Sequence, residues 1–240
     1  MPSSNRGGTS PRHLPDVATD RWTMSGQWAT RPEDVSQSGH RLLRFLEGIG
    51  PLDPSLRQWF WNAKPVTLDA ASLTNLLRKG KDHQFDEHGW TTAIWNGVPE
   101  PPGQSTFTVT CGVTASYLKN KIDFALPRPA GAGELYQLEN MLKLIESAIS
   151  AWQLSWCSVG PYGIWEAAGR GDSIGVFASW IVYLDNSLIT RLGDLPYGVR
   201  KLDVAQGSLF VMAPTPAELS LEVIDAVQQN VLLDPSWRLS

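Results

Sequence analysis

Three short runs between residues 89 and 126 alternate apolar and polar side chains, and turn-forming residues separate them. The clearest run alternates threonine with larger apolar side chains: Thr106, Phe107, Thr108, Val109, Thr110 and Cys111. Successive side chains leave opposite faces of a strand, so the threonines are expected on one face and the apolar residues on the other. The first run, 89–95, ends at Asn96-Gly97, and the third, 122–126, ends at Pro127, which has no N–H for a ladder. The stretch therefore predicts an antiparallel meander.

The flanking segments predict helices and further strands. Residues 22–28 alternate like a strand, and a nearly continuous apolar run at 176–184 is typical of a central strand. Two more strands are expected at 197–204 and 208–213, joined by a turn at Gln206-Gly207. The run of apolar residues from 134 to 152 has the period of an amphipathic helix.

Several helix starts are also indicated. Thr30 and Glu33 are spaced for a capping box with Pro32 in the first turn, ahead of an apolar helical period that ends near residue 50. A short helix is expected after Asp53-Pro54, and another after an Asp69 cap. Thr215 and Glu218, with Pro216 between them, predict a last capping box. Other segments are expected to connect these elements, among them a linker at 127–133 and a Gly-rich loop at 160–175.

Strands and helices in separate runs predict an α+β fold, with a mainly antiparallel mixed sheet flanked by helices. Residues 1–20 are expected to be a disordered lead-in, and residues 21–240 a single domain. A net charge of −4 argues against a nucleic-acid binder, which needs a basic stripe. No apolar stretch approaches the ~18–20 residues of a membrane span, and the N-terminus has no apolar signal core, so we expect no membrane segment and a cytoplasmic location.

The 2 cysteines, Cys111 and Cys157, lie in apolar surroundings and are interpreted as buried free thiols, although a single disulfide stays open. The 11 tryptophans are unusual. Their indoles are suited to a core, to a protein-binding surface or to a platform that stacks on sugar rings.

One polar stretch holds the side chains best suited to chemistry. His83 and His88 lie beside Asp82, Asp86 and Glu87, but without the spacing of a zinc site, so an acidic contact patch or a solvated loop is favoured over catalysis. The chain has no G-x-S-x-G, Walker A, H-E-x-x-H or post-strand G-x-G-x-x-G motif. We therefore predict no catalytic residues, no metal and no cofactor.

Five segments resemble the immunity protein 52 family. They are residues 28–33, 41–46, 90–97, 109–112 and 179–184, and the resemblance extends over about residues 21–232. Members of that family are antitoxins of bacterial polymorphic toxin systems, some linked to type VI secretion, and are paired with nucleases of the restriction-endonuclease-like class. The resemblance thus implies a protein that binds a cognate nuclease toxin and catalyses nothing.

A basic DNA-binding cleft would attract an acidic inhibitor. The expected toxin-binding residues are therefore the acidic loop and two nearby tryptophans: Asp82, Asp86, Glu87, Trp90 and Trp95. Two alternatives stay open at this point. A carbohydrate-binding module predicts a line of surface indoles, and a small hydrolase predicts a pocket where histidine and carboxylate groups converge.

Overall fold

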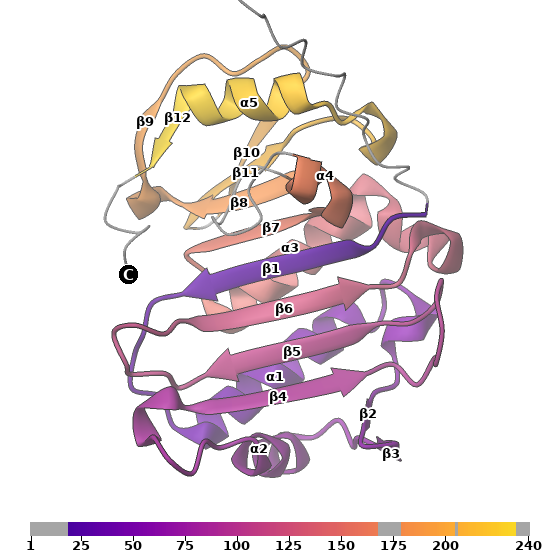
Figure 1. Ribbon diagram of the computed structural model, residues 1–240, viewed down its shortest axis with the longest axis vertical. Helices are drawn as coiled ribbons and strands as arrows, with labels where there is room; N and C mark the ends of the chain where they lie inside the picture. The colour runs from indigo at the N-terminus through magenta and orange to yellow at the C-terminus, as the bar shows by residue number, and fades with distance from the viewer. Residues whose placement is uncertain (1–18, 168–178, 205, 234–240) are drawn as a thin grey trace, which may run out of the picture.

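The computed structural model describes residues 19–167, 179–204 and 206–233, and within them one large sheet organises the chain (Figure 1). Its 10 strands lie in the order β10-β11-β8-β7-β1-β6-β5-β4-β2-β3. Their bounds, in that order, are Arg200–Val204, Gly207–Val211, Ile181–Asp185, Trp156–Pro161, Trp22–Trp28, Asn120–Leu126, Thr106–Cys111, Trp90–Trp95, Phe60–Trp61 and Lys64–Pro65. A second sheet pairs β9 (Ile189–Leu192) with β12 (Val231–Leu233).

The predicted meander is confirmed as β4, β5 and β6, which pair in sequence order. The third strand begins at Asn120, before the expected start, and β1 adds to its other side as predicted for residues 22–28. All pairings among the described strands are antiparallel, so the expected mixed sheet is in fact purely antiparallel. Strands from both sides of the 127–133 linker share this sheet.

Helices cover the sheet unevenly. Their bounds are α1 Val35–Ile49, α2 Ala70–Lys79, α3 Leu138–Trp152, α4 Tyr162–Ala167 and α5 Leu221–Asn230. Figure 1 shows α1 and α3 behind the central strands, while α4 and α5 lie in front at the β8 and β11 end. Strands β8 and β11 are accordingly buried on both faces, from Ile181 to Leu184 and from Gly207 to Val211. In front of β1, β6, β5 and β4 no helix of the described chain is drawn. The α+β prediction is confirmed.

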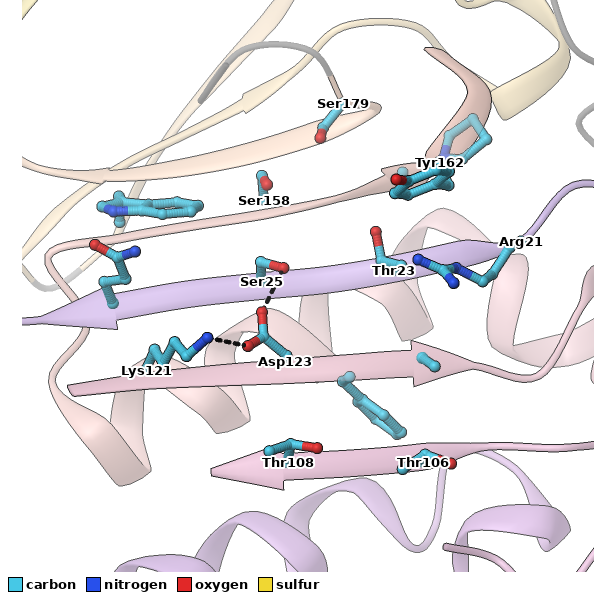
Figure 2. Close-up of a pocket in the computed structure, with 16 residues that line it drawn as sticks. Arg21, Thr23, Ser25, Thr106, Thr108, Lys121, Asp123, Ser158, Tyr162 and Ser179 are labelled. Atoms are coloured by element: carbon cyan, nitrogen blue, oxygen red, sulfur yellow. Dashed lines mark hydrogen bonds and ion pairs between the residues drawn. The ribbon is translucent and has the colours of Figure 1, made fainter. Parts of the chain in front are cut away.

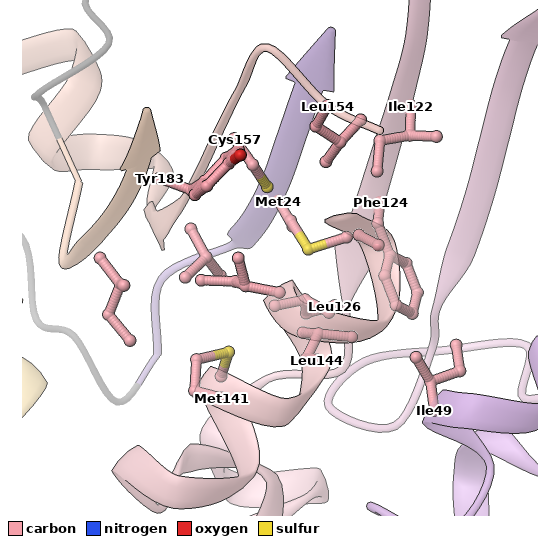
Figure 3. Packing of buried hydrophobic residues seen from close by; sticks show 14 of the residues in the cluster. Met24, Ile49, Ile122, Phe124, Leu126, Met141, Leu144, Leu154, Cys157 and Tyr183 are labelled. Carbon is pink, nitrogen blue, oxygen red and sulfur yellow. The ribbon is translucent and has the colours of Figure 1, made fainter. Parts of the chain in front are cut away.

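The core lies between the sheet and the helices behind it. Trp22, Met24 and Trp28 of β1 point into it, because they occupy alternate positions of the strand. Figure 3 shows Met141 and Leu144 of α3 packed beneath Met24, Phe124 and Leu126.

Two predicted capping boxes are wrong. Helix α1 begins at Val35, and its cap is Asp34, whose carboxylate accepts from the Ser36 N–H while Gln37 accepts from the Asp34 N–H. Glu33 is instead buried against Arg41. Thr215 does hydrogen-bond Glu218, but only across a 3₁₀ turn at Pro216–Glu218; α5 starts at Leu221 with Ser220 as its cap. Residues 215–218 form a turn that leads up to the helix, whereas residues 30–33 form no turn before α1.

The remaining predicted helices and strands agree with the structure at some positions and differ from it at others. The Asp69 cap is confirmed at the start of α2, and the segment after Asp53 forms a 3₁₀ turn, Pro54–Leu56. The expected helix at 134–152 is a 3₁₀ turn, Gly133–Tyr136, followed by α3. Strand β7 and helix α4 were not predicted, and α4 falls in the expected Gly-rich loop. The positions of residues 1–18, and of 176–178 in the expected central strand, lie outside the described residues.

Both cysteines are buried free thiols, as predicted. They lie on β5 and β7, which are three strand spacings apart, or about 14 Å, and a disulfide needs Cα atoms within about 7 Å. Burial raises the pKa of Cys111 to about 12 and also raises the pKa of Cys157. The possibility of a single disulfide is therefore excluded.

Candidate binding surface

The uncovered face of β4, β5, β6, β1 and β7, which we call the open face, is mainly polar. Register places Thr108, Asp123, Ser25 and Ser158 side by side across four strands. Each of these residues alternates with a buried apolar neighbour on its own strand, since one face of the sheet is packed and the other is solvated.

A hollow of about 460 Å³ lies on this face (Figure 2). Its floor follows from the register: Ala125, Thr23 and Gly160 are paired on three adjacent strands and carry small side chains. Gly160 is required there because a Cβ atom would lie 2.9 Å from the Trp180 backbone nitrogen. Three small residues in one row thus leave a depression between bulkier rows.

Charged groups lie at two sides of this hollow. Lys121 Nζ is 3.1 Å from an Asp123 carboxylate oxygen, and Ser25 Oγ donates to the other oxygen at 3.0 Å. At the opposite end, the Arg21 guanidinium carbon lies 4.3 Å from the centre of the Tyr162 ring, a cation–π contact. Figure 2 shows Arg21 and Tyr162 together at one end and Lys121 at the other.

A second hollow of about 460 Å³ shares Lys121 with the first and reaches the predicted acidic loop. Its walls include Asp82 and His88, and also Lys81 and Lys119. Asp82 therefore lies at one corner of the open face, among lysines that lower the local negative charge.

Two of the three acidic side chains are engaged within the loop. Asp82 accepts from the Gln84 N–H at 2.8 Å and lies 2.8 Å from His88 Nδ1; the backbone bond first, and then the His88 contact, lower the pKa of Asp82. Asp86 pairs with Lys81 at 2.6 Å, which lowers the pKa of Asp86. The Glu87 backbone carbonyl accepts from the Thr114 N–H, and Glu87 itself is exposed.

The two predicted tryptophans lie at opposite ends and on opposite faces of β4. Trp90 packs against the core, whereas Trp95 shares its face with Thr106 and lies 5.9 Å from the Phe60 ring. Five residues of strand separate them by about 16 Å. Only Trp95 is on the open face, and it is not next to the acidic loop.

Two aromatic residues that the sequence did not single out lie beside that loop. Phe85 is 46% and Tyr117 69% exposed, which places both among the few large apolar side chains in the described chain that face solvent. His88 lies between them, with its Nε2 2.9 Å from the Tyr117 hydroxyl and its ring 4.7 Å from that of Phe85. A Phe near acidic residues is a weak signal in sequence, and Tyr117 comes close only through the fold.

The structure weighs against a carbohydrate-binding module and bears only in part on a hydrolase. Nine tryptophan side chains are described; six are buried (Trp22, Trp28, Trp59, Trp152, Trp156, Trp180) and three are half-buried (Trp61, Trp90, Trp95), so they form no exposed line for a sugar. The lining of the first hollow holds one carboxylate, Asp123, and no histidine. The convergence expected of a hydrolase pocket is therefore missing from that hollow, whereas one His–carboxylate pair, His88 with Asp82, lies in the wall of the second.

Within the described residues, no three His, Cys, Asp or Glu side chains gather closely enough to hold a metal ion. No helix in the same residues has the length and apolar character needed to cross a bilayer.

These features define an α+β protein whose antiparallel sheet is covered on one face and presents a polar, hollowed surface on the other. The model of the family described as Immunity protein 52 matches residues 20–230, and the chain belongs to that family. No curated protein matches the chain. A solved chain described as a Pseudomonas aeruginosa T6SS protein superposes with a TM-score of 0.47 and 12% identity, covering 88% of this chain and 72% of that one.

Proposed function

We propose that the chain is an immunity protein that neutralises a cognate nuclease toxin by stoichiometric binding in the cytoplasm of the bacterium that makes the toxin. The observation that supports this role is the family match over residues 20–230. The nuclease class of the toxin, its restriction-endonuclease-like fold and its delivery by type VI secretion follow from the resemblance and are part of the proposal. Binding, rather than turnover, is the activity.

The open face fits this role physically. A stable protein interface buries about 800 Å² on each partner, which a face of several strands can supply. Exposed aromatic residues surrounded by polar groups are common energetic centres of interfaces, and Phe85 and Tyr117 have this setting. Of the residues predicted from sequence, Asp82, Asp86, Glu87 and Trp95 remain proposed toxin contacts, whereas Trp90 packs against the core. Phe85 and Tyr117 join the proposed contacts as anchors.

The direct test mixes the purified chain with its cognate toxin and a DNA substrate. We expect cleavage to stop at a molar ratio near one, because each bound toxin is inactive. Heat-unfolded chain at the same concentration is the control. Cleavage that continues at a several-fold excess of the folded chain would contradict the proposal.

The acidic loop has its own test. Asp86→Lys combined with Glu87→Lys should slow association with the toxin by about tenfold, because charges at an interface mainly set the association rate. Asp82 is left unchanged, since its carboxylate holds the turn at Gln84. Association is measured by stopped-flow fluorescence at low salt.

A matched variant gives the comparison. Glu139→Lys with Glu146→Lys makes the same change in net charge on exposed residues of α3, behind the sheet. If both double variants associate at the same rate, the effect is one of net charge and the acidic loop is not at the interface.

A further inference from the structure

We infer that the hollow floored by Ala125, Thr23 and Gly160 receives a loop of the toxin that presents a carboxylate to Arg21. The inference rests on the proposed function and deepens it, since it names the surface and the chemistry of the partner group. It also differs from the electrostatic expectation drawn from sequence, in which this chain supplies the acidic side of the interface.

The shape of the hollow indicates what enters it. Its volume of about 460 Å³ is in the range of pockets that enclose a small group of side chains. Lys121 lines both this hollow and the second one, so the hollowed surface extends beyond what a small molecule covers. A protein partner fits both the volume and the extent of this surface. The tip of one of its loops enters the hollow, and the rest of the partner contacts the surrounding strands.

The charges identify the chemistry of the inserted group. Asp123 is already bound by Lys121 and by the Ser25 hydroxyl, so both of its oxygens are engaged. Asp20, next to Arg21 in the chain, accepts the backbone N–H groups of Arg21 and Gly163, each at 2.7 Å. No ion pair of Arg21 occurs among the described residues.

Arg21 is also well presented. Its guanidinium lies over the Tyr162 ring, a contact that holds the charged group at this end of the hollow. The N–H donors of a guanidinium lie in its plane and match the two oxygens of a carboxylate. The hydroxyl groups of Thr23, Ser158 and Ser179 line the walls and can donate to or accept from the backbone of an entering loop.

Two variants test the inference in the full chain. Ala125→Trp fills the hollow from a half-buried position on the solvated face, where an aromatic residue is compatible with a strand. Arg21→Glu reverses the charge at one end of the hollow. Each should raise the dissociation constant for the cognate toxin at least about 30-fold, the loss typical of a truncated interfacial charge pair. Isothermal titration calorimetry measures it.

Controls of the same chemistry lie on helices, outside the lining of the hollow. Lys143→Glu on α3 and Ala71→Trp on α2, both at exposed positions, should change the dissociation constant less than about twofold, the range expected away from an interface. Arg21→Lys, which retains the charge but loses the planar fork, should fall between wild type and Arg21→Glu. Thermal melts confirm that every variant is folded.

The outcomes are separable. If the wild-type chain binds the toxin and both hollow variants bind equally well, the inference is overturned while the proposed function stands. Free glutamate that binds the isolated chain as tightly as the toxin does would assign the hollow to a small anion and also overturn it. Failure of the wild-type chain to bind the toxin at all would refute the proposed function itself.

Discussion

Replacing Gly39 with leucine is expected to destabilise the protein by about 3 kcal/mol or more, at the upper end of the range for overpacked sites. Gly39 is in the middle of α1, where glycine is unfavourable by about 1 kcal/mol relative to alanine. A helix retains such a residue when another backbone needs the space. Here the other backbone is that of α2.

The distances support this explanation. A Cβ atom on Gly39 would lie 2.2 Å from Thr74 Oγ1, 3.0 Å from Thr74 N and 3.1 Å from Thr74 Cα. The hydroxyl is fixed, because it donates to the Ala70 carbonyl at 2.6 Å, and the other two atoms belong to the backbone. A side chain at residue 39 must therefore move α2 away from α1 and disturb the buried Leu73 and Leu77.

A second glycine in the same helix provides the control. A Cβ atom on Gly48 meets only the Ser147 side chain, at 2.8 Å from Oγ and 3.1 Å from Cβ. Ser147 Oγ donates to the Lys143 carbonyl at 2.8 Å, but this bond is exposed, so the hydroxyl can exchange it for water and no backbone atom has to move. Gly48→Ala should be neutral or stabilising by up to about 1 kcal/mol through helix propensity, whereas Gly39→Ala should destabilise. Urea denaturation measures both. Equal effects of the two alanine variants would show that close packing of α1 on α2 is not the reason for Gly39.

The sheet could be predicted largely from local pattern. Residues 106–111 alternate so regularly that one face had to be apolar, and the turns on either side placed β4 and β6 beside them. Strand β7 was missed because Trp156–Pro161 is buried at five of its six positions and shows no alternation. A strand whose residues are nearly all buried cannot be distinguished by its period from other buried segments.

The binding surface was less predictable for a different reason. Thr106 and Thr108 were assigned correctly to the face opposite the apolar residues, but the hollow depends on Ala125, Thr23 and Gly160 coming into one row. Those residues are far apart in the chain, and only strand order brings them together. Likewise, the sequence grouped Trp90 with Trp95, although an odd spacing on one strand places them on opposite faces.

Glu33→Ala is the second variant expected to have a large effect, about 3 kcal/mol of lost stability, since removing one partner of a buried ion pair typically costs 3–5. The Glu33 side chain is only 2% exposed. It pairs with Arg41, lies 3.8 Å from Arg31 and accepts from Ser38 Oγ at 3.2 Å. The lower end of the range applies because the side chains of Arg31 and Arg41 are 30% and 24% exposed and can reach water.

The network joins two helices that are far apart in sequence. Arg41 donates to the Ala151 carbonyl at 2.8 Å, and Arg31 donates to the Trp152 carbonyl at 3.3 Å, at the end of α3 where carbonyls have no partner within the helix. Burial lowers the pKa of Arg31, followed by repulsion from Arg41, and Glu33 opposes both. Without Glu33, two guanidiniums face each other at one helix end.

Urea denaturation of Glu33→Ala is compared with Glu47→Ala, an exposed position in α1, the helix that follows Glu33; this control should change stability by less than about 0.5 kcal/mol. Glu33→Gln retains the shape without the charge, so a loss close to that of Glu33→Ala would assign the effect to the ion pair. If Glu33→Ala is as stable as Glu47→Ala, the buried carboxylate does not hold α1 to α3. The aromatic stack of Trp28 on Trp152, at 5.0 Å between ring centres, would then be the principal contact at this end of the core.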